Sequence, residues 1–99
     1  MNIIITNQAH KQMQEIFEYI SRDSSYYAQK TIKEIYLKIN ILEFMPYIGR
    51  KIPEYNMNDM RELIYKSYRI MYKIIENKDE IHILIIHNSK QSFKTSNNF

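Results

Sequence analysis

The residues of this sequence best suited to chemistry are two arginines and a histidine in its second half. Arg69 lies within the segment Tyr68–Tyr72, Arg61 precedes it, and His87 ends an apolar run. A guanidinium group presents a planar fork of N–H donors that suits carboxylates and phosphates. Histidine titrates near pH ~6.5, so it can serve as a general acid or base. Together these residues indicate an anion-binding surface, with His87 as the best acid or base candidate in the chain.

Positive charge is concentrated in the same half of the chain. Residues 1–48 hold five cations and five anions, whereas residues 49–99 hold nine cations and six anions, so the whole net charge of +3 lies in the second half. Such a bias is typical of a chain with an acidic partner, either nucleic acid or acidic protein. The candidate target- or phosphate-binding residues are Arg50, Lys51, Arg61, Arg69, Lys73 and Lys90.

The first half of the chain predicts one strand and a helical hairpin. Residues 2–6 form a short β-branched run, and apolar residues then recur at helical spacing from Asn7 to Ser21. A polar break follows, in which Ser25 is the preferred N-cap of a second helix. That helix is expected to continue to Pro46, because proline disfavours helical geometry at the residue before it.

The second half predicts three consecutive antiparallel strands at residues 60–65, 68–75 and 81–87. Side chains alternate along a strand, so Arg69 and Lys73 share one face and apolar residues share the other. We therefore expect an α+β fold of order β-α-α-β-β-β, with both helices on the apolar face. The other face is expected to be partly open, as a shallow concave site that carries the cations.

His87 and Arg69 each allow two interpretations. By strand parity His87 shares a face with Ile81 and Ile83, opposite the cations, which favours a structural or interface hydrogen bond over catalysis. Arg69 either faces an anionic partner or bridges to Glu62 on the neighbouring strand. His10 and His82 are expected to be solvated.

Five segments in this order resemble the RelE/ParE superfamily of bacterial toxins, with the closer likeness to ParE-like members. The resemblance extends from Ile3 to about Phe93 and is carried by residues 16–20, 45–54, 61–63, 68–72 and 83–87. It implies the toxin of a type II toxin-antitoxin pair, neutralised by a cognate antitoxin that is encoded beside it.

The superfamily contains two mechanisms. RelE-like members are ribosome-dependent endoribonucleases that cut mRNA with basic residues and a C-terminal aromatic, whereas ParE-like members poison DNA gyrase. Leu63 and Gln91 stand where the nucleases carry basic residues, and Phe93 cannot donate a proton as a tyrosine can. The resemblance therefore favours a gyrase poison, with an mRNA interferase using Arg69, Arg61 and His87 as the alternative. A non-toxic antitoxin-binding module is a further alternative.

Composition limits the remaining possibilities. The 99 residues are expected to form one domain, with a flexible tail from about residue 94. The chain contains no cysteine, no Gly-rich phosphate loop and no metal-binding motif, so no metal or other cofactor is expected. No apolar run approaches the ~20 residues of a membrane span, which predicts a cytoplasmic protein without membrane contact.

Overall fold

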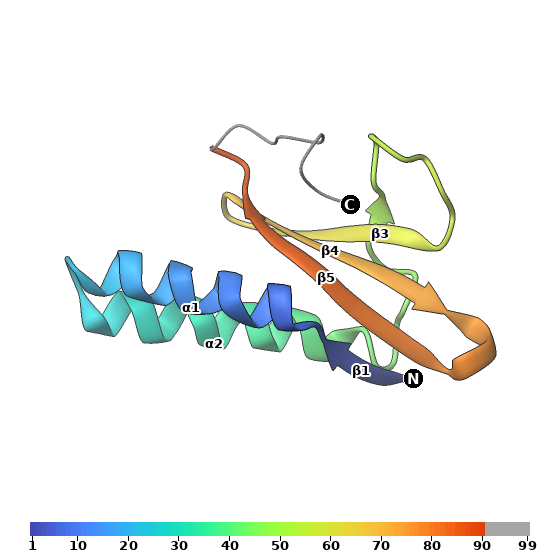
Figure 1. Ribbon diagram of the computed structural model, residues 1–99, viewed down its shortest axis with the longest axis horizontal. Coiled ribbons are helices and arrows are strands. Elements are labelled where there is room, and N and C mark those ends of the chain that lie inside the picture. Colours follow the sequence, from blue (N-terminus) through green and yellow to red (C-terminus); the bar gives the residue numbers. More distant parts are fainter. Residues whose placement is uncertain (91–99) are drawn as a thin grey trace.

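The computed structural model of this protein describes residues 1–90, which form a helical layer packed on a mixed sheet (Figure 1). Gln91, Phe93 and the predicted flexible tail lie outside these residues. The elements are β1 (Asn2–Ile5), α1 (Asn7–Ser21), α2 (Ser25–Ile41), β2 (Arg50–Lys51), β3 (Met60–Tyr65), β4 (Tyr68–Ile75), a 3₁₀ turn (Glu76–Lys78) and β5 (Glu80–Asn88). The sheet order is β1-β5-β4-β3-β2, and only β1 with β5 is parallel. The predicted α+β fold and its three antiparallel strands are confirmed.

Thr6 determines where β1 ends and α1 begins. Its hydroxyl accepts a hydrogen bond from the Ala9 backbone N–H at 3.2 Å, which satisfies one of the unpaired donors of the first helical turn. The same hydroxyl donates to the Ile83 carbonyl of β5 at 2.8 Å. Thr6 therefore both caps α1 and attaches the start of this helix to the sheet.

The ends of α2 differ from the prediction. Ser24, not Ser25, is the N-cap, and its hydroxyl accepts from the Tyr27 backbone N–H at 3.2 Å. The helix ends at Ile41, before Pro46, because the chain tightens there into i→i+3 turns such as Phe44 N–H to the Ile41 carbonyl. Within residues 1–90, neither helix combines the length and the hydrophobicity needed to cross a bilayer.

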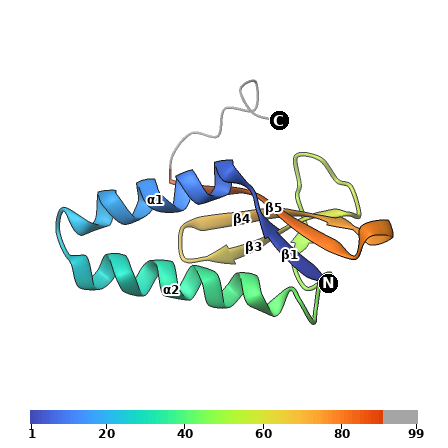
Figure 2. The same ribbon diagram turned by 60° about the horizontal axis from the view of Figure 1, so that its bottom comes forward.

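The main core lies between the two helices and the sheet, and Figure 2 shows α1 and α2 side by side along this layer. Each helix contributes the apolar stripe that its periodicity predicts. The fully buried side chains of this core include Ala9, Ile35, Ile39, Leu42, Ile70, Tyr72, Ile81 and Ile83.

The sequence did not predict β2, because two residues are too few to show an alternating pattern. Arg50 pairs with Glu62 and Lys51 pairs with Arg61 of β3. After β2 the chain turns over the face of the sheet away from the helices, where Ile52 packs with Met71 and Ile85 as a second small core. Part of the face predicted to be open is therefore covered.

Gly49 is required where the chain passes β3 and β4. Its backbone N–H donates to the Tyr72 hydroxyl at 3.0 Å, and that hydroxyl donates to the Pro46 carbonyl at 2.8 Å. A Cβ atom at Gly49 would lie 2.5 Å from the Tyr72 hydroxyl and 2.6 Å from the Glu62 carbonyl oxygen. The backbone can approach this closely only without a side chain.

We expect Gly49→Ala to lower the free energy of unfolding by about 2–3 kcal/mol, the typical cost of overpacking a buried site. Urea denaturation at neutral pH measures this change. The matched control is Ser25→Ala at an exposed residue, which should change the same quantity by less than about 0.5 kcal/mol. Equal stability of Gly49→Ala and the wild type would contradict the close approach.

Candidate functional site

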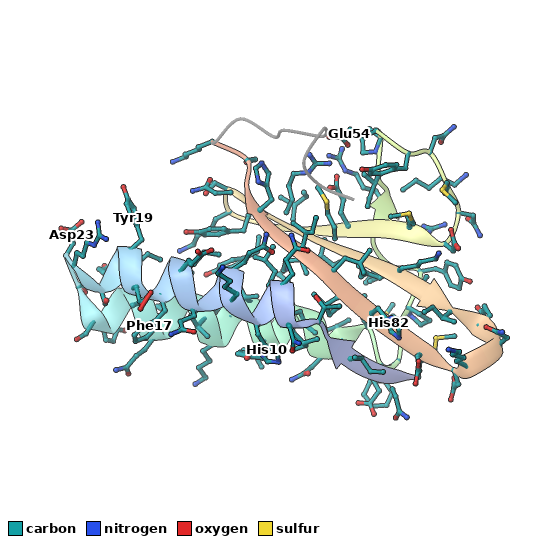
Figure 3. All side chains as sticks on the ribbon, in the orientation of Figure 1. His10, Phe17, Tyr19, Asp23, Glu54 and His82 are labelled. Atoms are coloured by element: carbon teal, nitrogen blue, oxygen red, sulfur yellow. The ribbon has the colours of Figure 1, made fainter. Side chains whose placement is uncertain are left out.

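A cluster of charged side chains lies on the face of the sheet away from the helices. Cross-strand pairing puts Arg50 of β2 beside Glu62 of β3, in the row that continues to Met71 and Ile85 of the second core. Arg69 follows on β4, two residues before Met71, and so shares this face. Glu54, from the chain between β2 and β3, lies on the same side (Figure 3). We call Arg50, Glu54, Glu62 and Arg69 the arginine–glutamate cluster.

Arg69 is the most highly connected member of this cluster. Its Nη1 and Nη2 atoms donate to the two carboxylate oxygens of Glu54, each at 2.8 Å, and its Nε donates to Glu62 at 2.7 Å. Only 12% of its side chain is exposed. The sequence predicts the correct face for Arg69, but the expectation of an uncovered cation is wrong. The alternative, a bridge to Glu62, is present.

Glu62 is a buried carboxylate shared by two arginines. Its side chain has no exposed surface, and its second oxygen accepts from Arg50 Nε at 2.6 Å. A buried carboxylate is costly unless it is paired and hydrogen-bonded, and both of its oxygens are satisfied here. Arg50 remains 61% exposed, so this member of the pair reaches the solvent.

The ion pair between Glu54 and Arg69 shifts the pKa of both side chains. Hydrogen bonds from Arg69 lower the pKa of Glu54 to about 2, from an ordinary value of 4.5. The hydrogen bond to Glu54, supported by Glu62, raises the pKa of Arg69. Glu54 and Arg69 are therefore both charged throughout the physiological pH range.

His87 lies on the face opposite to the one predicted. The register between β4 and β5 shifts after Tyr72, which pairs with Ile83, whereas Met71 pairs with Ile85. Leu84 is the extra residue of this β-bulge, and one inserted residue reverses the facing of all later side chains. His87 consequently pairs with Arg69 and shares its face.

Arg61 holds the backbone of the neighbouring loops and lies outside the arginine–glutamate cluster. Its guanidinium donates to the carbonyls of Gly49 at 2.8 Å, Asn58 at 3.0 Å and Tyr47 at 3.2 Å. It also stacks on the Tyr47 ring, with 5.0 Å to the ring centroid. Arg61 pairs with Tyr72 and Lys51, so these residues share the other face of the sheet.

The remaining predicted residues are dispersed. Lys73 shares the face of Arg69 but lies four positions further along the strand, or about 13 Å away. It pairs with His82, whose Nε2 lies 3.0 Å from a Glu80 carboxylate oxygen. Lys90 is exposed at the end of the described residues. The structure therefore joins Arg50 to Arg69 through Glu62, places His87 opposite Arg69, and leaves the other candidates outside this cluster.

A groove of about 680 Å³ runs between α1 and the end of β5. The pairing of β1 with β5 ends near Ile83, so within residues 1–90 no strand pairs with the following edge of β5. Instead of a strand, the Gln12 side chain of α1 accepts a hydrogen bond from the Ile86 backbone N–H at 2.8 Å. The groove is lined by Gln12, Glu15, Ile16, Glu18, Tyr19, Arg22, Tyr68, Ile86, His87, Asn88 and Lys90.

Sequence reasoning missed the position of this groove and the role of Glu54. A groove depends on where β1 stops relative to β5, which periodicity does not reveal. Glu54 stands alone between a proline and a tyrosine, and its pairing with Arg69 spans 15 residues. Within residues 1–90, no three histidine, aspartate or glutamate side chains are grouped so that they could hold a metal ion.

The fold and the sequence together define the class of protein as a toxin of the RelE/ParE superfamily. Residues 3–93 match the family described as "ParE toxin of type II toxin-antitoxin system, parDE". Because this match covers most of the chain, the protein belongs to the ParE toxin family. The resemblance seen in the sequence is confirmed.

Comparison with solved structures supports the fold. The chain is similar to a structure described as "Chromosomal ParDE TA system from P. aeruginosa", with a TM-score of 0.73 and 20% sequence identity. The similarity covers 89% of this chain and 95% of that one. No curated protein matches the sequence.

We expect Glu54→Gln to lower the free energy of unfolding by about 1–2 kcal/mol at pH 7, because the ion pair is partly exposed and screened by solvent. The pKa of Glu54 is lowered to about 2 in the folded state, so this stabilisation is complete above pH 4.5 and disappears as the pH falls toward 2. Urea denaturation of both proteins across this range measures the difference.

The matched control is Glu43→Gln, at an exposed residue after α2. It should leave the stability and its pH dependence within about 0.5 kcal/mol of the wild type. A Glu54→Gln difference that persists unchanged at pH 2 would show that the carboxylate does not act through its charge.

Proposed function

We propose that this toxin inhibits bacterial growth by poisoning DNA gyrase in the cytoplasm. Family membership supports a toxin, and the resemblance to ParE-like members supports gyrase as the target. The single observation that carries this choice over RNA cleavage is the state of the candidate catalytic cations. Arg69 donates to two carboxylates and Arg61 donates to backbone carbonyls, so both guanidinium groups already serve the fold.

Metal-free RNA cleavage needs different surroundings. A base must remove the 2′-hydroxyl proton, a cation must stabilise the charge that develops on the phosphate, and an acid must protonate the leaving oxygen. Two carboxylates beside Arg69 repel an incoming phosphate. One observation favours the RNase alternative, since His87 pairs across the strands with Arg69 and could act as a base. A non-toxic antitoxin-binding module is the third possibility.

Purified toxin should convert supercoiled plasmid into cleaved DNA in the presence of gyrase, and His87→Ala should retain this effect within about threefold. An RNase that used His87 as a general base would instead lose roughly 10²–10⁴-fold of its cleavage rate with this substitution. Gyrase cleavage assays and mRNA cleavage assays on translating ribosomes measure the two outcomes. Intact gyrase function together with cuts in ribosome-bound mRNA would overturn the proposal.

Membership of a toxin-antitoxin family implies a cognate antitoxin as the partner of this chain. We propose that a segment of the antitoxin occupies the groove between α1 and β5. Tyr19, Ile16 and Tyr68 offer it apolar and aromatic surface, and the edge of β5 beyond the end of β1 offers backbone groups. A segment that packs on helix and strand edge together would bury both kinds of surface in one binding event.

Tyr19→Ala should raise the Kd of the complex with the antitoxin from the neighbouring reading frame by about tenfold, the effect of losing an aromatic anchor. Tyr26→Ala is the matched control, because 68% of Tyr19 and 67% of Tyr26 are exposed and each makes one ring contact. Tyr26 does not line the groove. Isothermal titration calorimetry measures both values, and equal effects would exclude the groove as the binding site.

A further inference from the structure

A second apolar stripe lies on the side of α2 that faces away from the core. Ile35 and Ile39 face the core and are fully buried. Leu37 and Ile41 each follow two residues later, about half a helical turn around the axis, and are exposed. Two exposed apolar residues after the helix continue this line. We call the four residues the outer stripe: Leu37 (51% exposed), Ile41 (42%), Phe44 (82%) and Met45 (52%).

The outer stripe forms one surface because the chain keeps a helical path just after Ile41. The Phe44 backbone N–H donates to the Ile41 carbonyl at 3.1 Å, and the Met45 N–H donates to the same carbonyl at 3.0 Å. The steps of four, three and one residues between members therefore keep them on one side of the axis. With its other side α2 packs on α1 and β3, and it lies along the lower edge of the molecule in Figure 2. Within residues 1–90 the outer stripe is thus left to the solvent.

The size of the outer stripe indicates an interface. It presents roughly 400 Å² of contiguous apolar surface, within the range of about 300–600 Å² for the largest patch on a monomer, and such patches are often functional. We propose that two copies of this toxin associate through the outer stripe as a two-fold dimer, with their α2 helices antiparallel. A standard interface buries ~800 Å² of each partner, and the outer stripe supplies about half of that area, so we expect a weak and reversible dimer.

The charge around the outer stripe favours a second copy over an acidic partner. Residues 33–45 contain two cations, Lys33 and Lys38, and two anions, Glu34 and Glu43. The excess positive charge of the chain lies in residues 49–99. An acidic partner is attracted to that half, whereas a neutral surface can meet its own copy without repulsion. A two-fold axis also provides each outer stripe with an apolar counterpart of equal size.

Two lysines determine the direction in which the helices pair. Lys30 and Lys33 continue the line of the outer stripe toward the start of α2, at steps of three and four residues. In a parallel pair each lysine would lie beside its own copy, and like charges repel. In an antiparallel pair with Leu37 opposite Ile41, Lys33 of one copy lies beside Met45 of the other. The apolar stem of Lys33 can then cover Met45 while its ammonium group reaches water.

The dimer leaves the groove between α1 and β5 accessible. The residues that line this groove come from α1, the start of β4 and the end of the described chain, and none of them belongs to the outer stripe. One copy can therefore bind another through α2 while each copy binds an antitoxin segment through its groove. Dimer formation goes beyond the proposed function, and sedimentation measures it without gyrase or antitoxin.

Sedimentation equilibrium of the purified toxin between about 10 µM and about 1 mM measures the association. We expect the average mass to rise from that of one chain toward that of two. Phe44→Ser should raise the dimer Kd by about tenfold or more, the effect of losing an aromatic anchor. Tyr19→Ser is the matched control, because 68% of Tyr19 is exposed and it lies on α1 outside the outer stripe. Its dimer Kd should stay within about twofold of the wild type. Far-UV circular dichroism shows that both variants are folded.

Spin labels on single cysteines measure the direction of the helices, since the chain has no cysteine of its own. Asn40→Cys is exposed and near the two-fold axis of the antiparallel pair, so its two labels should lie within about 25 Å of each other. Ser25→Cys is at the start of α2, and a rise of about 1.5 Å per residue on both sides of the axis separates its labels by about 40 Å. A parallel pair would instead bring the labels at both positions close together.

A toxin that stays monomeric over this concentration range, or that forms assemblies larger than dimers, overturns the proposal. An equal effect of Phe44→Ser and Tyr19→Ser on the dimer Kd does so too, and short distances at both labelled positions overturn the antiparallel arrangement. Isothermal titration calorimetry with the antitoxin from the neighbouring reading frame tests the other occupant. If Phe44→Ser weakens antitoxin binding and leaves self-association unchanged, the outer stripe is an antitoxin site and the proposed dimer is wrong.

Discussion

The buried carboxylate of Glu62 is the interaction on which the face of the sheet away from the helices depends. A carboxylate without exposed surface must be compensated, and Arg50 and Arg69 provide this compensation from the strands on either side. β2 is only two residues long, and the ion pair of Arg50 with Glu62 attaches it to β3 in addition to the backbone pairing. Glu54 then neutralises the second arginine and brings its loop down over Met71. One buried charge thereby links β2, β3 and β4 to one another and to the loop that carries Glu54.

Because side chains alternate along β3, this strand holds neighbouring segments in place on both faces of the sheet. Glu62 organises the cluster on one face, while the adjacent Arg61 binds the Gly49, Tyr47 and Asn58 carbonyls on the other. The segment from α2 to β3 has almost no regular structure of its own, yet it is fixed from both sides. The single glycine allows this segment to approach Tyr72. The cations that the sequence predicts to form a binding surface therefore serve first to hold this segment in place.

Local patterns in the sequence were sufficient for most of the fold. The apolar stripe of residues 7–21 and the alternation of residues 68–75 each report the environment of neighbouring residues, which is what periodicity encodes. The misplaced features depend on contacts between distant residues. The facing of His87 depends on one inserted residue at Leu84, and the state of Arg69 depends on Glu54. Neither a bulge nor a pairing between a loop and a strand leaves a periodic signal.

The β-bulge also links the start of the chain to the candidate site. The Thr6 hydroxyl lies 2.8 Å from the Ile83 carbonyl and 3.3 Å from that of Leu84, so the cap of α1 holds the bulge in place. Because this bulge turns His87 toward Arg69, the site combines a histidine and an arginine as a nuclease would. Glu54 and Glu62 prevent this use, because their carboxylates already accept the hydrogen bonds of the arginine that a phosphate would need. The same frame thus favours recognition of a partner over cleavage of RNA in this chain.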